Sequence, residues 1–158
     1  ALPGPAAGAG LSLALSCDLR IAADTAIMST AFVKIGLSGD YGGTYLLTQL
    51  VGPAKARELY LLGDRIDMTE AARIGLVNWI VPAAELETRA LALAKRLASG
   101  PRLAHRFIKD NLNRALRSSF AECLDGESAN LMQLRDTEDH KEAARAFAEK
   151  RAPKFTGR

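Results

Sequence analysis

Residues 5–23 read PAAGAGLSLALSCDLRIAA, and this stretch decides how the rest of the chain is interpreted. It opens with proline, alanine and glycine, and such small residues let a backbone turn tightly and approach another group closely. An apolar segment that is compatible with a helix follows, carried by Leu11, Leu13, Ala14, Leu15 and Cys17. A helix that begins directly after a Gly/Ala turn presents unpaired N–H groups and the positive end of its dipole. Gly8-Ala9-Gly10 is therefore a candidate oxyanion-binding turn, although close helix packing explains a Gly/Ala start equally well.

Downstream of this stretch, the pattern predicts short strands and a glycine-rich loop, followed by helices. Strands are expected at residues 19–23, 26–29 and 77–81, and the four glycines of residues 35–44 indicate a loop. Helices are expected at residues 44–50, 54–62, 69–74, 86–97, 103–116, 120–133 and 138–150. A strand-and-loop half thus precedes a helical half, which predicts an α/β domain.

The composition is typical of a globular protein, with 158 residues of which 48% are hydrophobic and 25% are charged. No apolar run approaches the roughly 20 residues needed to span a bilayer, so no membrane partner is expected. Cys17 and Cys123 form no CxxC or CxxH pattern, which indicates neither a disulfide framework nor a zinc site. The chain is expected to be cytoplasmic, with two reduced thiols.

The net charge of +3 lies entirely in the last third of the chain. Residues 1–100 hold nine basic and nine acidic residues, whereas residues 101–158 hold twelve and nine. A weak basic bias suits an anionic ligand or a nucleic acid, but it is also typical of a solvated helical surface, which we favour. The absence of interleaved aromatic and basic residues in this third argues against RNA.

Two further features are candidates for chemistry. Asp40 is the only carboxylate in the glycine-rich loop, where it is either a turn residue or a general base whose backbone can approach a substrate. The tail at residues 149–155 joins basic residues to one aromatic, which suits a phosphate and a stacked base, or else a frayed terminus. His105 and His140 lie on expected surface helices without supporting partners, and no GxSxG, HExxH, P-loop or GxGxxG motif is present.

The order of these motifs resembles the enoyl-CoA hydratase/isomerase (crotonase) superfamily. Residues 5–23 are similar to its second oxyanion-hole segment, and residues 32–44 (FVKIGLSGDYGGT) are similar to its active-site loop. Residues 51–78 resemble its next signature, and residues 137–155 resemble its C-terminal helix and tail. The resemblance covers essentially the whole chain.

The resemblance implies an α/β crotonase spiral core at residues 1–82, truncated at its N-terminus, and a helical trimerisation region at residues 83–158. Members of the family carry the first oxyanion donor and the contacts to the CoA adenine upstream of this point. The implied partners are an acyl-CoA thioester and further copies of the chain in a homotrimer or a dimer of trimers. No cofactor is implied apart from the coenzyme A of the substrate, and no metal or nucleic acid.

The implied chemistry is the stabilisation of a thioester enolate by backbone N–H groups, of which the Ala9 N–H is one by position. Hydratases of the family use two glutamates, and the matching positions hold Ser12 and Phe32, which argues against classical hydration. Asp40 falls where isomerases that shift double bonds or open rings place a catalytic acid. The resemblance therefore implies an isomerase in which Asp40 moves a proton. It also implies substrate contacts at Gly8, Gly10, Ala31, Phe32, Gly39, Tyr41, Lys154 and Phe155.

Three alternatives remain open at this point. The chain can belong to a hydratase, or to an enzyme of another crotonase reaction that uses a different acid. It can belong to a catalytically degenerate protein that binds CoA esters. It can also be a fragment that has no activity by itself, because half of the oxyanion hole is missing.

Overall fold

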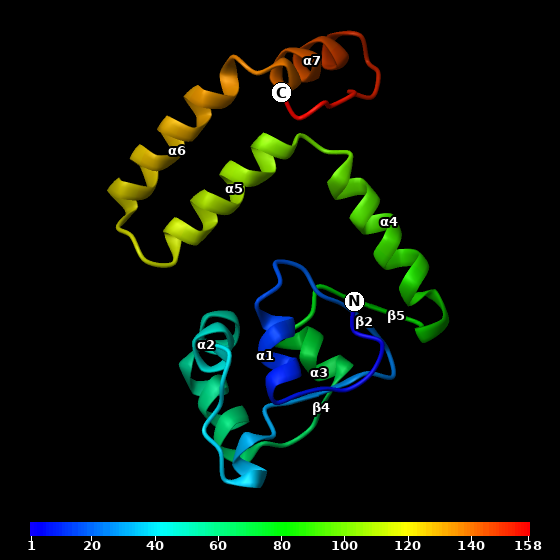
Figure 1. The fold of residues 1–158 in the computed structure, drawn as a ribbon, viewed down its shortest axis with the longest axis vertical. Helices are drawn as coiled ribbons and strands as arrows, with labels where there is room; N and C mark the ends of the chain where they lie inside the picture. Colours follow the sequence, from blue (N-terminus) through cyan, green and yellow to red (C-terminus); the bar gives the residue numbers. More distant parts are fainter. The chain divides into compact units, whose positions relative to one another are not determined.

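The computed structural model describes residues 1–158, which form two compact units (Figure 1). Unit 1 comprises Ala1–Ala92 and unit 2 comprises Leu93–Arg158. The division falls inside α4 (Leu86–Ala98), whereas the sequence analysis placed the end of the core at residue 82. Leu86 is buried in the core of unit 1, so the first turns of α4 belong to that core.

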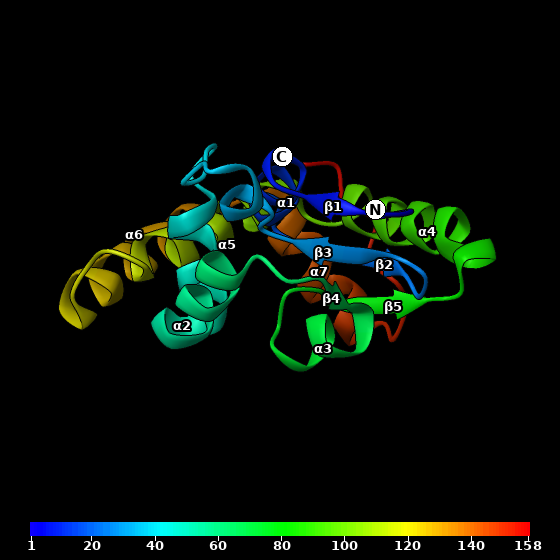
Figure 2. The ribbon, with the colours of Figure 1, turned by 90° about the horizontal axis from the view of Figure 1, so that it is seen from below.

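Five short strands form two small sheets in unit 1 (Figure 2). In one sheet, β3 (Ile27–Ser29) lies between β1 (Ala6–Ala7), to which it is parallel, and β4 (Ile66–Asp67), to which it is antiparallel. In the other, β2 (Ile21–Ala23) pairs in parallel with β5 (Trp79–Val81). The strands predicted around β2, β3 and β5 are confirmed with shorter bounds. The sequence analysis missed β1 and β4, because two residues are too few to show an alternating pattern.

Helices fill the connections between these strands. The first is α1 (Ala9–Leu15), which follows β1 directly, and a 3-10 helix, η1 (Phe32–Ile35), follows β3. The long helix α2 (Gly43–Leu62) contains Gly52 at φ 77° and ψ 164°, so it is two helical segments across a kink, as predicted. The short helix α3 (Met68–Arg73) and the 3-10 helix η2 (Ala83–Glu85) complete the unit.

The core of unit 1 lies where α1 and α2 pack against the strands and the loop before β5. Leu11 and Leu15 point inward from α1, and Met28, Leu47 and Leu76 are fully buried around them. Complete burial of one such side chain contributes roughly 1.5–3 kcal/mol to folding. This core fixes the position of α1, and therefore of the turn at its start.

Buried polar side chains connect the ends of the elements. Arg20 donates from Nε to the carbonyl of Leu76 at 2.7 Å and from its terminal nitrogen to the carbonyl of Cys17 at 2.5 Å, and burial lowers the pKa of its guanidinium. Ser29 is the last residue of β3 and Thr30 follows it, and their hydroxyls donate to the carbonyls of Gly63 and Leu59 at 3.0 and 2.7 Å. The end of β3 is thereby attached to the last turn of α2.

Unit 2 consists of the end of α4 and three further helices, α5 (Arg102–Ala115), α6 (Phe120–Arg135) and α7 (Glu138–Ala148). All four helices predicted after residue 85 are confirmed. Ser119 and Glu122 form a capping box at the start of α6, and Thr137 caps α7. None of the helices in the structure combines the length and the apolar character needed to cross a membrane.

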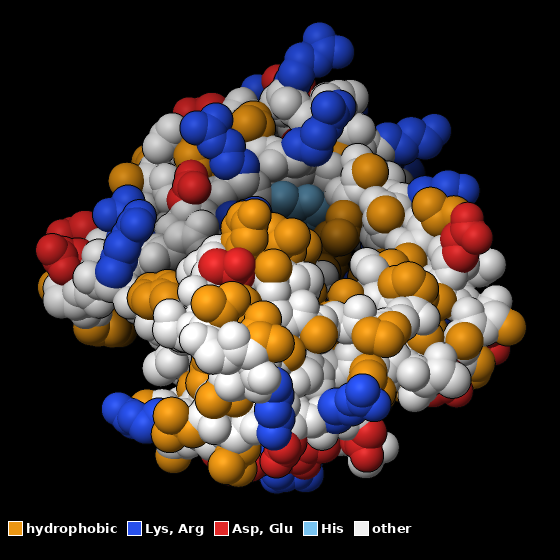
Figure 3. Space-filling model, turned by 60° about the horizontal axis from the view of Figure 1, so that its bottom comes forward, with side chains coloured by type: hydrophobic (Ala, Val, Ile, Leu, Met, Phe, Trp, Pro, Cys, Tyr) orange, Lys and Arg blue, Asp and Glu red, His pale blue; other side chains and the backbone are white.

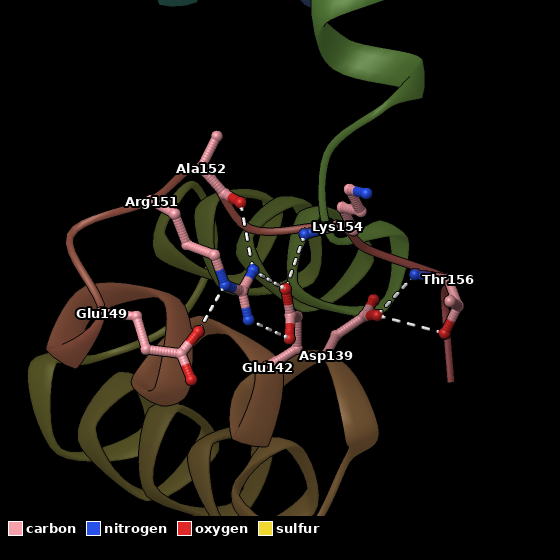
Figure 4. A network of polar contacts seen from close by, with 7 residues as sticks. All are labelled: Asp139, Glu142, Glu149, Arg151, Ala152, Lys154 and Thr156. Atoms are coloured by element: carbon pink, nitrogen blue, oxygen red, sulfur yellow. Dashed lines mark hydrogen bonds and ion pairs between the residues drawn. The ribbon is translucent and has the colours of Figure 1, made fainter.

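The C-terminal tail of unit 2 is attached to α7 rather than frayed (Figure 4). The buried carboxylate of Asp139 accepts hydrogen bonds from the amides of Thr156 and Gly157 at 2.7 and 2.9 Å. Glu142 forms two bonds with the guanidinium of Arg151, at 2.6 and 3.0 Å, and also accepts the amide of Lys154 at 2.9 Å. Two carboxylates on successive turns of α7 therefore hold the whole tail.

Candidate active site

The turn before α1 leaves the first helix amides available, that of Ala9 among them. Gly8 adopts φ 52° and ψ −123°, a conformation that only glycine takes without strain, and its N–H donates to the carbonyl of Ser29 at 3.0 Å. The next amide, that of Ala9, begins the helix and donates to no acceptor within the protein. The predicted oxyanion donor is therefore not used by the fold itself.

The ring of Phe32 closes one side of this turn. A Cβ atom placed on Gly8 would lie 3.7 Å from the ring, so glycine and ring are in contact. Ala31 directs the ring inward with a strained backbone of φ 60°, and the amide of Phe32 bonds the carbonyl of Thr30 at 2.7 Å. The apolar surface expected at Phe32 is thus buried beside the amide of Ala9.

Tyr60, in the second half of α2, lies on the other side of Phe32. The two rings are stacked at an interplanar angle of 5°, with their centroids 6.4 Å apart. The Tyr60 hydroxyl lies beside the buried hydroxyl of Ser12 in α1, which lowers the pKa of the phenol. A side chain on Gly43 would collide with both hydroxyl groups, with the Tyr60 oxygen only 2.6 Å away. Phe32 of η1, Ser12 of α1 and Gly43 at the start of α2 therefore all lie around the Tyr60 phenol, which belongs to the second half of α2.

Asp40 lies in the loop that passes over this phenol. Burial raises the pKa of Tyr60, the neighbouring Ser12 hydroxyl opposes that rise, and the negative charge of Asp40 adds to it. The Asp40 carboxylate is thus close enough to act on Tyr60, while it is itself exposed and forms no ion pair. Gly39 has φ 124°, and a Cβ atom there would lie 3.2 Å from the Tyr60 ring. Tyr41, a predicted contact of the acyl group, is exposed.

The predicted tail residues, Lys154 and Phe155, belong to unit 2. Lys154 lines a charged hollow of about 470 Å³ together with Arg145 and Arg151. Phe155 lines an apolar hollow of about 210 Å³ whose other walls include Leu103 and Leu134. Within unit 1, Gly8 and Gly39 thus lie beside the stacked rings of Phe32 and Tyr60, and Asp40 is exposed in the loop next to Gly39. Lys154 and Phe155 line two different hollows of unit 2.

The sequence pattern does not predict that Tyr60 lies at this site or that Ser12 lies beside it. The resemblance only places Ser12 where hydratases have a glutamate. Tyr60 shares its helix with Gly43, but the kink at Gly52 lies between them, so no helical periodicity relates the two positions. Only the folded chain places this phenol beneath the glycine-rich loop.

Comparison with known proteins matches the whole chain, residues 1–158, to a family described as enoyl-CoA hydratase/isomerase. A probable enoyl-CoA hydratase of Mycobacterium bovis is 43% identical over 158 residues, which are 100% of the chain and 62% of that protein. A short-chain-enoyl-CoA hydratase of Clostridium acetobutylicum is 37% identical over 151 residues, 96% of the chain and 58% of that protein. A crystal structure from the enoyl-CoA hydratase of Geobacillus kaustophilus matches with a TM-score of 0.94 at 40% identity, over 99% of the chain and 61% of that structure. The chain spans about three fifths of the length of these relatives.

Proposed function

The chain belongs to the enoyl-CoA hydratase/isomerase family and has its crotonase α/β fold, and from this we propose that the protein isomerises an enoyl-CoA thioester. The observation that carries the proposal is the set of side chains around the Ala9 amide. Phe32 and Ser12 offer no carboxylate there, and the buried hydroxyl of Ser12 donates to the carbonyl of Gly8. Asp40 is the carboxylate whose charge reaches this cluster.

In the proposed reaction, the thioester oxygen gains negative charge as an enolate forms, and the N–H of Ala9 binds that oxygen. One donor of this kind is worth about 3–4 kcal/mol in a site that excludes water. An alanine at this position does not hinder the role, because the donor is the main chain. The neighbouring Gly8 and Gly10 keep side-chain atoms away from the oxygen.

Asp40 acts as the base and then as the acid. Its carboxylate removes a proton from the carbon alpha or gamma to the thioester, and the electrons of the broken C–H bond pass into the conjugated enolate. The same proton then returns to another carbon of the conjugated system, so the double bond moves without any net gain or loss. Ala31, Phe32, Gly39 and Tyr41 are the residues that we propose to contact the acyl group.

Hydration is the second candidate, because both of the relatives above are named enoyl-CoA hydratases. Addition of water requires a base to activate the water and an acid to protonate the carbon beside the thioester. With Ser12 and Phe32 at the two glutamate positions, Asp40 would have to serve both steps. Isomerisation needs one group that takes and returns a proton, and it therefore fits this site better.

The test uses the full-length gene product, assayed with a 3-enoyl-CoA and with crotonyl-CoA. We expect conversion of the 3-enoyl substrate, and we expect Asp40→Asn to abolish it while acyl-CoA binding is retained. Asp64→Asn is a matched control, because Asp64 is an exposed carboxylate that pairs with Lys34. Hydration of crotonyl-CoA without isomerisation would instead support the hydratase. Thermal stabilisation by acyl-CoA without any turnover would support a binding protein.

The partners that we propose are an acyl-CoA thioester and two or five further copies of the chain. Support comes from large hydrophobic side chains that lie exposed on unit 2, which include Ile108, Leu112, Leu116, Phe120, Leu131 and Met132. Figure 3 shows, for one face of the molecule, that exposed hydrophobic side chains lie among charged ones. We propose that Lys154 and Phe155 contact the CoA of a neighbouring copy in the cytoplasm. Light scattering that reports a monomer at all concentrations would exclude the trimer and the dimer of trimers.

A further inference from the structure

The loop that carries Asp40 has little of its own to hold it in place. Residues 36–42 are almost entirely exposed, and Gly36, Gly39, Tyr41 and Gly42 all have positive φ. No side chain of this segment forms a hydrogen bond. The backbone bond from the amide of Gly43 to the carbonyl of Asp40, at 3.0 Å, closes its last turn. A segment of this kind needs an external support if its carboxylate is to stay in one position.

The support is a ring of contacts beneath the loop, made by Gly8, Phe32, Tyr60 and Ser12. Phe32 touches Gly8 and stacks on Tyr60, and the hydroxyls of Tyr60 and Ser12 lie side by side next to Gly43. The Ser12 hydroxyl donates its one proton to the carbonyl of Gly8 at 3.4 Å, so its oxygen is left to accept from a neighbouring donor, and the contacts return to Gly8. The Tyr60 phenol leaves no room for a side chain on Gly39, within the loop, or on Gly43, just after it, because a Cβ atom there would lie 3.2 or 2.6 Å from it.

We propose that Tyr60 is a positioning residue whose hydroxyl, bonded to Ser12, holds the loop at residues 39–43 and so fixes Asp40 relative to the Ala9 amide. The proposal rests on the function proposed above. The stacked ring alone would fill the same space if it were phenylalanine, so the hydroxyl is the informative group. A phenol has an ordinary pKa of about 10, so Tyr60 is protonated and able to donate at neutral pH. Burial raises its pKa further, while the neighbouring Ser12 hydroxyl opposes that rise.

The kinetic test compares Tyr60→Phe, Ser12→Ala and the double variant in the full-length gene product. Each single variant should lower kcat for the 3-enoyl-CoA about 10- to 100-fold with KM little changed, because a small displacement of a catalytic group has effects of this size. The double variant should be no slower than the slower single variant, since both remove the same bond. Tyr45→Phe is the matched control, as it removes a phenol oxygen from an exposed position on α2. We expect Tyr45→Phe to leave kcat unchanged.

A second measurement reads the loop without using activity. Hydrogen exchange of the Gly43 amide should become roughly tenfold faster in Tyr60→Phe, because one supporting hydrogen bond is lost. Exchange of the Gly36 amide, which bonds the carbonyl of Val33 at 3.2 Å, should stay the same.

The two measurements separate the failure of this inference from the failure of the proposed function. If Asp40→Asn abolishes isomerisation while Tyr60→Phe changes neither kcat nor the exchange of Gly43, the positioning role is wrong and the isomerase stands. If Tyr60→Phe accelerates exchange in a protein without isomerase activity, Tyr60 holds the loop and the proposed reaction is wrong. If the effects of Tyr60→Phe and Ser12→Ala on kcat multiply in the double variant, the two residues do not act through one shared bond. If the loss of activity equals the loss of folded protein, the positioning role is also wrong.

Discussion

The ring of Phe32 lies parallel to the ring of Tyr60, at an interplanar angle of 5° and with 6.4 Å between the centroids. Phe32 begins η1 just after β3, and Tyr60 lies near the end of α2, so the pair joins two elements that are distant in the sequence. The outer edge of Phe32 contacts Gly8, and the hydroxyl of Tyr60 lies beside that of Ser12. The stacked pair therefore connects the turn before α1 to the support of the Asp40 loop.

Removal of the Phe32 ring should destabilise unit 1 strongly. Phe32→Ala leaves a cavity between Gly8 and Tyr60, and such truncations cost about 3–5 kcal/mol in the free energy of unfolding. Phe147→Ala is the control, because that ring is 87% exposed, and it should change the value by less than about 0.5 kcal/mol. Urea unfolding followed by circular dichroism measures both. Equal losses in the two variants would contradict the packing described for Phe32.

A methyl group at position 43 should disturb the start of α2. Gly43→Ala would collide with the hydroxyls of Ser12 and Tyr60, and overpacking of this kind costs about 1–3 kcal/mol. The loss should be smaller in a Tyr60→Phe background, where one of the colliding atoms is absent. Gly10→Ala provides the contrast, because no atom lies within 4 Å of the added methyl, and a helical alanine stabilises by about 0.5–1 kcal/mol relative to glycine. Thermal unfolding of the native chain, the three single variants and the double variant measures these differences.

The buried guanidinium of Arg20 should not tolerate replacement by lysine. Arg20→Lys cannot reach the carbonyls of Leu76 and Cys17 in the same geometry, and an unsatisfied buried acceptor costs about 1–3 kcal/mol. Arg73→Lys should leave the free energy of unfolding unchanged, since Arg73 is exposed and pairs with Glu70. Denaturant unfolding tests this, and a tolerated Arg20→Lys would show that these two bonds are dispensable.

The attachment of the tail should weaken in acid. The bond from Arg151 is the main cause that lowers the pKa of Glu142 from 4.5 to about 2. A lowered pKa in the folded state stabilises it above the unfolded value, so this contribution is complete above pH 4.5 and is lost as the pH falls towards about 2. Glu142→Gln should therefore destabilise the protein at neutral pH, and its difference from the native chain should disappear over that interval.

The control for Glu142 is Glu87→Gln, since the structure shows no ion pair for Glu87. Hydrogen exchange of the Lys154 amide, which bonds Glu142, measures the attachment directly as the pH is lowered. An effect of Glu142→Gln that stays constant from neutral pH to pH 2 would contradict an ionic origin.

The kinked α2 and the helices after residue 85 could be predicted because their signals are local. Gly52-Pro53 marks the kink by backbone chemistry alone, and apolar residues at helical spacing mark α4 to α7. The same is true of the turn at Gly8, where small residues precede an apolar helix. The two-residue strands β1 and β4 were missed, since they exist only by pairing with β3.

The candidate site also has some features that residue types predict and others that only the tertiary structure shows. Residue types alone determined that a Gly/Ala turn begins α1, that Asp40 is the carboxylate of a glycine-rich loop, and that Ser12 and Phe32 cannot act as carboxylate bases. Only the tertiary structure decided that the Gly8 amide is bonded while the Ala9 amide is not, and that a phenol from the far end of α2 supports the loop. The reason is physical: turn and helix preferences act between near neighbours in the chain, whereas stacking and hydroxyl contacts form only when the core brings distant segments together.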